Sequence, residues 1–349
     1  MIGTVGNPVI VQEEDSEFSV KNVCIFRFDG DDVKSRWFYY SLKSEYIEKQ
    51  INRLLDGSTQ KFVPLGTLRS LNIPVPLNKK EQQKIAKILT TVDNLIEKTE
   101  ALIEKYQAIK QGMMHDLFTR GIDTNGQLRP SHQDAPHLYK QTELGWIPGE
   151  WKLKELRECV DSDITYGIVQ AGPHIDGGVP YIRTGDMSGD QFLREGMLCT
   201  SESISNSFKR SRIQTGEIVC AIRATVGKVL PVPPQLDGAN LTQGTARIAP
   251  SNEYNNRYIL WVIRSHQVQR ELSLVIKGTT FLEITLDQLR KIKVLTPRDR
   301  DEQKQIAMKL DQLEMRLQNE RTHLEKLQFV KKGLMQDLLT GKVRVKTNG

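Results

Sequence analysis

The sequence predicts an α+β protein in which one strand-rich unit occurs twice and each copy ends in a long helix. The first observation is that the chain repeats itself at a constant offset, as from Gly57 to Gly278. The second is that each copy ends in a segment with the apolar seven-residue period of a coiled coil. The third is that short runs of strand-forming residues, separated by Gly and Pro, precede the second of these segments. We expect two strand-rich domains, the first incomplete, joined by two long helices in an antiparallel coiled coil with pseudo-two-fold symmetry.

The internal repeat runs without a gap from Gly57–Thr119 to Gly278–Thr340. About 20 of about 63 aligned positions are identical. Identical pairs include Leu65 and Leu286, Pro76 and Pro297, Glu81 and Glu302, Ile85 and Ile306, and Leu117 and Leu338. Chance does not hold one register over such a distance, so the repeat indicates a duplicated domain.

The two copies differ at their amino-terminal side. Thr4-Val5-Gly6 aligns with Thr225-Val226-Gly227 at the same offset. Roughly 80 residues precede this motif in the second copy, from about 144 to 224, whereas the first copy begins almost at it. We therefore expect the first domain to lack its front portion. Three explanations stay open: a disrupted gene, a separately encoded front piece, or a start assigned too late.

The domain boundaries follow from the repeat and from a polar segment between the copies. Residues 121–143 are rich in Gly, Pro, Asp, Asn and Gln and lack an apolar period, which predicts a linker long enough to let the helices run antiparallel. The predicted order is an incomplete domain (1–78), a long helix (79–120), the linker (121–143), a complete domain (144–299), a long helix (300–341) and a tail (342–349).

Shorter elements are expected in each copy. Strands are predicted at Val179–Arg183, Glu217–Ile222 and Gly244–Ile248. A helix is predicted at Val33–Asn52 in the first copy and at Asn255–Leu274 in the second, each followed by a Gly-Ser-Thr or Gly-Thr-Thr loop. A strand that ends in proline, Leu71–Pro76 or Ile292–Pro297, then leads into the long helix.

In both long segments, apolar residues recur at steps of four and three over about five heptads, with one inversion near Ile109. The expected helix–helix interface comprises Ile85, Leu89, Val92, Ile96, Ile103, Tyr106, Met113 and Leu117 in the first helix and Ile306, Leu310, Leu313, Leu317, Leu324, Leu327, Leu334 and Leu338 in the second. Ile109 and Val330 also fall on the two seams. One polar residue, Thr99 or Glu320, interrupts each seam at the same repeat position and is expected to fix the register. Taken alone, these seams would also fit a simple dimerisation stalk.

Composition restricts the class of protein. The 349 residues carry a net charge of +6, which permits a polyanionic partner without proving one. No apolar run reaches the length of a membrane span, and we expect neither a membrane association nor a signal peptide. The four cysteines are scattered without a CxxC pair, which favours a cytoplasmic chain with reduced thiols.

The order of parts resembles the specificity subunit of type I restriction–modification systems over essentially the whole chain. The matching residues are Leu144-Gly145-Trp146-Ile147-Pro148 with Trp151 at the opening of a domain, the Thr-Val-Gly motif, the Gly-Thr-Thr loop, the Pro-x-x-x-x-Glu-Gln helix start, and the ending Gly-x-Met-x-Asp-Leu-Leu-Thr-Gly at 333–341. The resemblance implies that the strand-rich regions are target recognition domains and that the long helices pack antiparallel.

The resemblance also implies a function. Such a subunit binds a bipartite sequence in double-stranded DNA and has no catalytic residue or cofactor of its own. Two modification subunits, which bind S-adenosylmethionine, methylate adenine, and restriction subunits complete the nuclease. A helix of about 38 residues spans roughly 57 Å, so it could set the spacing of two sites about one DNA turn apart.

Polar and basic side chains of the strand-rich regions are the expected DNA contacts, because Lys and Arg bind phosphates while Arg, Asn, Gln, Ser and Thr read base edges. The candidates are Arg183, Thr184, Lys209, Arg210, Arg212, Arg223, Lys228, Asn240, Thr242, Gln243, Lys277, Thr279 and Thr280, together with Thr59 and Lys61 in the first copy. Each of them could equally be an ordinary solvated side chain.

Catalytic motifs are not evident. Gly3–Gly6 lacks the Gly-Lys-Ser/Thr ending of a phosphate loop, and the six histidines have no partners at zinc-binding spacing. Pro233-Pro234 is not preceded by Asn or Asp, unlike the Asn-Pro-Pro-aromatic motif of an adenine methyltransferase. The alternatives that remain are a coiled-coil scaffold with incidental basic charge, a self-contained enzyme, and a non-functional remnant of a disrupted specificity gene.

Overall fold

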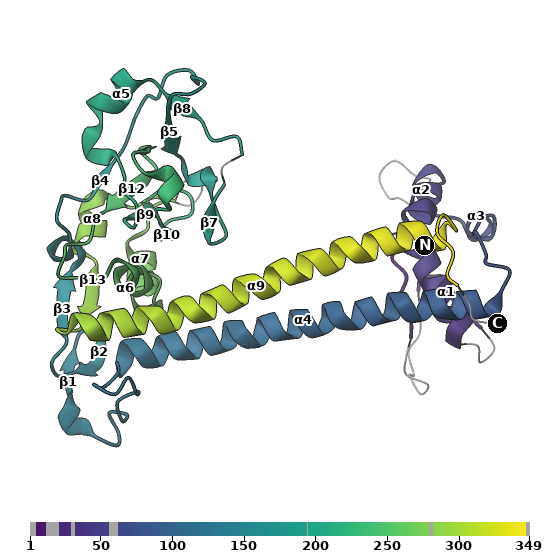
Figure 1. The fold of residues 1–349 in the computed structure, drawn as a ribbon, viewed down its shortest axis with the longest axis horizontal. Helices are drawn as coiled ribbons and strands as arrows, with labels where there is room; N and C mark the ends of the chain where they lie inside the picture. The colour runs from purple at the N-terminus through teal and green to yellow at the C-terminus, as the bar shows by residue number, and fades with distance from the viewer. Residues whose placement is uncertain are drawn as a thin grey trace. The chain divides into compact units, whose positions relative to one another are not determined.

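The computed structural model describes residues 5–11, 21–28, 32–55, 62–193, 195–278 and 282–346, which form two compact units (Figure 1). Unit 1 comprises Met1–Tyr106 and Arg316–Gly349, and unit 2 comprises Gln107–Met315. Both long helices, α4 (Lys79–Thr119) and α9 (Arg300–Leu339), contribute to both units. The remaining helices of unit 1 are α1 (Asp32–Leu42), α2 (Glu45–Arg53) and α3 (Leu65–Arg69).

Unit 2 combines helices with several small sheets. Its described helices are α5 (Glu202–Ser207), α6 (Asn256–Ile263), α7 (His266–Val275) and α8 (Leu286–Lys291), and its 3-10 turns are η1 (Pro136–Leu138), η2 (Leu156–Cys159), η3 (Thr184–Asp186), η4 (Lys209–Ser211) and η5 (Pro234–Leu236). Its strands are β1 (Tyr139–Thr142), β2 (Gly145–Pro148), β3 (Lys152–Glu155), β4 (Thr165–Tyr166), β5 (Val179–Ile182), β6 (Met187–Ser188), β7 (Gln191–Phe192), β8 (Cys199–Thr200), β9 (Ile218–Ala221), β10 (Val229–Pro231), β11 (Asn240–Leu241), β12 (Thr245–Ile248) and β13 (Lys293–Thr296).

The central strand β9 separates two hydrophobic cores of unit 2. The sheet order is β10-β9-β12-β4, and all four residues of β9 are buried. Successive strand side chains point to opposite faces. Ile218 and Cys220 accordingly join the core beneath the helices, whereas Val219 and Ala221 join the core under β5 and β11. The second core supports the loops that follow β5, β9 and β11.

The predicted long helices and strands agree well with the structure. The strands expected near residues 179, 217, 244 and 292 are β5, β9, β12 and β13. In the first copy, the strand expected at Leu71–Pro76 is not formed. The expected loops at Gly57–Thr59 and Thr279–Thr280 lie outside the described residues.

Each predicted short helix is two helices in the structure. Ser44 caps α2 by accepting a hydrogen bond from Ile47 N, and Ser265 caps α7 by accepting one from Val268 N. A serine at this position satisfies an amide that the new helix leaves unpaired. The two serines are repeat counterparts, so the break is a shared feature that apolar periodicity alone did not reveal.

The two long helices run antiparallel in each unit. In unit 2, Leu117 near the end of α4 shares a core with Ile306 and Leu310 near the start of α9. In unit 1, Ile85 and Leu89 near the start of α4 share a core with Leu338 and Leu339 near the end of α9.

At the inversion in the heptad pattern, charged residues rather than apolar ones face the opposing helix. Ile109 and Val330 are exposed, which corrects the expectation that they lie on the seams. The lysines that follow them turn inward instead: Lys110 pairs with Glu314 in unit 2, and Lys331 Nζ lies 2.6 Å from Asp93 Oδ1 in unit 1. These two ion pairs are repeat counterparts of each other.

The predicted linker is an ordered part of unit 2. Residues 139–142 form β1, which pairs antiparallel with β2. Arg129 donates to the Glu302 carboxylate, with Nη1 2.5 Å from Oε1, and Glu302 also accepts from Ile122 N at 3.0 Å. Composition showed that residues 121–143 lack an apolar period. It could not show that Glu302 of α9, which is distant in sequence, holds this segment in place.

Candidate nucleic-acid interface

Six predicted DNA contacts gather along one edge of unit 2, where the loops after β5, β9 and β11 meet. We call this the polar rim, and it consists of Arg183, Thr184, Arg223, Thr242, Gln243 and Lys277. Its backbone is tied together: Thr242 N donates to Ile182 O at 3.1 Å, and Arg223 N donates to Gly244 O at 3.3 Å. The loops of three different strands therefore present their side chains together.

A short bridge extends the polar rim to the segment before α8. Lys277 N donates to Glu283 O at 2.9 Å, and the Arg223 guanidinium lies 3.3 Å from the Glu283 carboxylate. Arg223, Gln243 and Lys277 are exposed, so their side chains can reach a ligand. Two cations and an amide in this position suit phosphate and base-edge contacts.

Arg183 is held in place by an acidic neighbour. Its Nη2 donates to Asp186 Oδ1 at 2.7 Å and its Nε donates to Oδ2 at 3.0 Å. The hydrogen bonds that Arg183 donates to the Asp186 carboxylate raise the pKa of Arg183 above its ordinary value. The guanidinium is therefore a fixed, partly exposed cation, with less freedom to reach a base than Arg223 has.

Lys209 and Arg210 lie on a separate turn. They belong to η4, and both side chains are exposed. The Arg210 carbonyl accepts a hydrogen bond from Arg247 Nη1 at 3.2 Å, which fixes the turn against β12. These two cations can contact phosphates, although they are not part of the polar rim.

Two expectations are corrected by burial. Asn240 is fully buried, where its amide accepts from Ser205 Oγ and donates to Phe208 O at 3.2 Å. Arg212 is half-buried and donates to Ser205 Oγ from both Nε and Nη2. Their polar groups are occupied in holding α5 against β11, so we do not place them among the DNA contacts. Thr279, Thr280, Thr59 and Lys61 lie outside the described residues.

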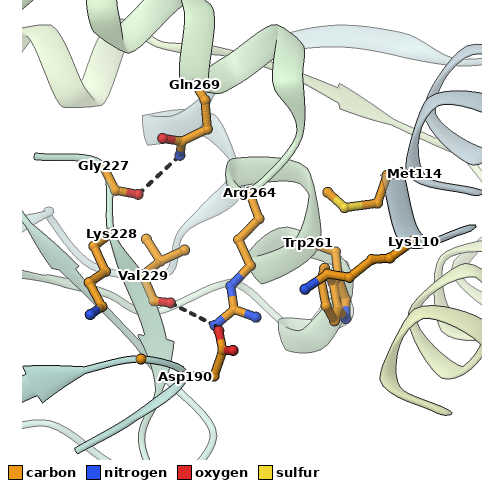
Figure 2. Close-up of a pocket in the computed structure, with 10 residues that line it drawn as sticks. Lys110, Met114, Asp190, Gly227, Lys228, Val229, Trp261, Arg264 and Gln269 are labelled. Carbon is orange, nitrogen blue, oxygen red and sulfur yellow. Dashed lines mark hydrogen bonds and ion pairs between the residues drawn. The ribbon is translucent and has the colours of Figure 1, made fainter. Parts of the chain in front are cut away.

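The remaining candidate, Lys228, lines a basic cavity of about 340 Å³ in unit 2 (Figure 2). Lys110 and Arg264 also line it, opposite one acidic residue, Asp190. Lys228 Nζ donates to Met187 O at 2.8 Å, which holds its charge at the wall of this cavity. Lys228 thus belongs to a different surface from Arg223, although the two are close in sequence.

Arg264 is the most enclosed cation of this cavity. Its Nη2 donates to Val229 O at 2.9 Å and lies 3.6 Å from Asp190 Oδ1, and its guanidinium stacks 5.1 Å from the Trp261 ring centroid. Burial lowers the pKa of Arg264 below its ordinary value. Sequence reasoning missed both because Lys110 lies on the long helix α4 and Arg264 caps the end of α6, outside the strand-rich loops. The available signal was the three-residue spacing of Trp261 and Arg264, which places the arginine beside the indole at the end of α6.

The described part of the chain shows neither a cluster of metal-ligating side chains nor a membrane-spanning helix. No group of three or more His, Cys, Asp or Glu side chains there could hold a metal ion. None of the helices described has the length and apolar character that crossing a bilayer requires.

Comparison with known proteins gives a consistent result. A family described as "Type I restriction modification DNA specificity domain" matches residues 1–106 and 148–328. The MjaVIII specificity subunit of a type I restriction enzyme from Methanocaldococcus jannaschii is 28% identical over 321 residues, which are 89% of this chain and 70% of that protein. The EcoBI specificity subunit from Escherichia coli is 25% identical over 300 residues, which are 84% of this chain and 61% of that protein.

A solved structure shares the fold. The crystal structure of a type I restriction–modification S subunit from M. genitalium superposes with a TM-score of 0.57 at 18% sequence identity. The match covers 87% of this chain and 72% of that one.

Proposed function

We propose, since this chain belongs to the type I restriction–modification DNA-specificity family, that it is the subunit which reads the DNA target sequence for that class of enzyme. The polar rim of unit 2 is the observation that carries the proposal. Arg223, Gln243 and Lys277 combine exposed cations with an amide on loops that a buried core holds in place. Such a combination fits backbone contact by the cations and base reading by the amide.

Catalysis is proposed to come from other subunits. Modification subunits, two in number, would supply S-adenosylmethionine binding and adenine methylation, and restriction subunits would supply cleavage. This chain would act in the cytoplasm. Basic residues on η4, Lys209 and Arg210, would add phosphate contacts beside the polar rim.

The proposal is tested by co-expressing the chain with its modification subunit and mapping methylated adenines in genomic DNA. Methylation at one defined motif supports sequence reading by this chain. A bipartite motif would show that both copies contribute, and a half-site motif would show that unit 2 reads alone. A stable complex that methylates no defined sequence would contradict the proposal and favour a scaffold or a non-functional remnant.

The polar rim is tested by two substitutions and a matched control. Gln243→Ala is expected to relax the base preference at one position, a loss of about 1–3 kcal/mol in discrimination. Arg223→Ala is expected to weaken binding across sequences and to lower the slope of log affinity against log salt by about one. Lys291→Ala removes an exposed cation on α8 that pairs with Asp287. If Lys291→Ala weakened binding as much as Arg223→Ala, general charge rather than the polar rim would be responsible.

A further inference from the structure

Residues 72–75 of unit 1 are the repeat counterparts of β13 but pair with no strand among the described residues. In unit 2, β13 pairs antiparallel with β3. In the described part of unit 1, residues 72–75 carry neither a strand nor a bridge. Their other edge is nevertheless anchored as in unit 2: Asn72 N donates to Gln50 Oε1 at 3.0 Å, as Lys293 N donates to Glu271 Oε2 at 3.1 Å. Gln50 and Glu271 are also repeat counterparts.

The missing strand leaves apolar residues open to solvent. Val75 is 56% exposed, whereas its counterpart Thr296 is 2% exposed. Ile73 is partly exposed, whereas its counterpart Val294 is fully buried. The segment that begins with β3 makes the difference in unit 2, because β3 pairs with β13 and the buried Leu156 that follows it shares a core with Val294.

The uncovered edge keeps the hydrogen-bond donors that a partner strand needs. In unit 2, Leu156 N donates to Ile292 O at 2.9 Å, so alternate residues from Ile292 onward face the partner strand. The counterparts of these residues include Ile73 and Val75, which both have an N–H. The two prolines of this edge, at positions 74 and 76, fall on residues whose N–H would point away from the partner.

A second part of the same face also lacks its cover. In unit 2, the Trp151 indole Nε1 donates to both oxygens of Glu302 at 3.2 Å. The counterpart of Glu302 is Glu81, which binds Arg344 Nη2 at 2.7 Å. The arginine side chain on Glu302, that of Arg129, is 12% exposed, whereas that of Arg344 is 74% exposed.

The turn after α4 in unit 2 is covered by the tryptophan ring, whereas the turn after α9 in unit 1 is open. A Cβ added to Gly121, just after α4, would lie 2.6 Å from Trp151 Cζ2. A Cβ added to Gly341, just after α9, would meet no atom within 4 Å. Both glycines have a positive φ, +62° and +73°, but Gly341 is the repeat counterpart of Arg120, so the two turns are offset by one residue.

We propose that this open face of unit 1, formed by residues 71–77, Glu81 and the turn at Gly341, binds a partner polypeptide that presents a segment like residues 149–160 of unit 2. The incoming segment would add a strand antiparallel to residues 72–75 and place a tryptophan against Glu81. Residues 149–160 of unit 2 show the chemistry that fits: a tryptophan, a four-residue strand, and then buried Leu156 and Cys159. A second copy of this chain does not fit, because its own segment is fully engaged with β13.

The test uses the full chain and a fluorescent peptide with the sequence of residues 149–160. Saturable binding is expected by fluorescence anisotropy. A peptide with Trp151→Ala should bind about tenfold more weakly, because it lacks the aromatic anchor. In the full chain, Val75→Pro removes an N–H that faces the peptide and should weaken binding about fivefold. Val75→Ala keeps that N–H and serves as the matched control.

Hydrogen exchange of the unmodified chain provides a second readout that does not depend on a substitution. The amides of Ile73 and Val75 should exchange rapidly in the chain alone and slow down when the peptide is added. No saturable binding up to about 1 mM peptide would overturn the proposal. Equal binding by Val75→Pro and Val75→Ala would also overturn it. A dimer of the chain that protects residues 72–75 without peptide would identify a second copy as the occupant instead.

Discussion

The substitution Glu302→Gln is expected to destabilise unit 2 far more than the same change at Glu81 destabilises unit 1. Glu302 accepts hydrogen bonds from Arg129, from the Trp151 indole and from Ile122 N, and only 7% of it is exposed. Glutamine keeps the shape of the side chain but removes the charge that compensates a buried guanidinium. Glu81, by contrast, binds an arginine that is largely in solvent.

The structure sets the expected magnitude. Removing one partner of a buried ion pair costs about 3–5 kcal/mol. Glu150 lies 2.5 Å from Arg129 Nη2 and remains after the substitution, so part of the compensation is kept. We therefore expect a loss of about 2–3 kcal/mol in the free energy of unfolding of unit 2.

The assay is equilibrium unfolding in urea followed by tryptophan fluorescence, because Trp151 lies against the substituted side chain while Trp37 reports on unit 1. The transitions of the two units are fitted separately. A loss below about 1 kcal/mol for Glu302→Gln would refute the reasoning, since that is the range of a solvent-exposed pair. An equal loss for Glu81→Gln would refute it as well.

Gly121→Ala is expected to lower the free energy of unfolding by about 3 kcal/mol, because strain at positive φ adds to contact with buried side chains. Gly341→Ala should lower it by about 1 kcal/mol, because only the strain applies there. Similar losses for the two substitutions would contradict this reasoning. Burial raises the pKa of the Cys220 thiol to about 12. A thiol reagent at pH 8 should therefore leave Cys220 unlabelled, as measured by mass spectrometry, until unit 2 unfolds. Rapid labelling of Cys220 would contradict this expectation and show that its surroundings open. The hydrogen bond from Arg344 lowers the pKa of Glu81 below 4.5, so its stabilisation of unit 1 is present above that pH and is lost as the pH falls through the lowered value. Glu81→Gln should flatten this acid dependence, measured by unfolding at pH 7 and pH 4, and an unchanged profile would exclude Glu81 as its source.

The order of elements was predictable because it depends on local patterns. A repeat, a seven-residue apolar period and strands bounded by Gly and Pro are visible without knowing which segments touch. The polar rim was also partly predictable, because Arg223 and Gln243 follow buried strands at turns, where polar residues reach the surface.

The role of individual polar residues was not predictable. Asn240 and Gln243 are three residues apart in one polar run, yet Asn240 is fully buried and Gln243 is exposed. The difference arises because α5 closes over one end of β11, and Ser205 of that helix bonds to Asn240. Only the tertiary structure brings these distant segments together.

The sequence by itself determined the duplication and the two long helices, because both can be identified from the spacing of residues along the chain. The tertiary structure decided which residues of those helices face each other. Heptad counting could not choose between Ile109 and Lys110 at the inversion, because the choice depends on Glu314 in the opposing helix, which pairs with the lysine. The tertiary structure also decided how the two copies differ in what packs against them. Glu81 and Glu302 are identical residues at the same repeat position. Their environments differ because a different segment packs against each of them.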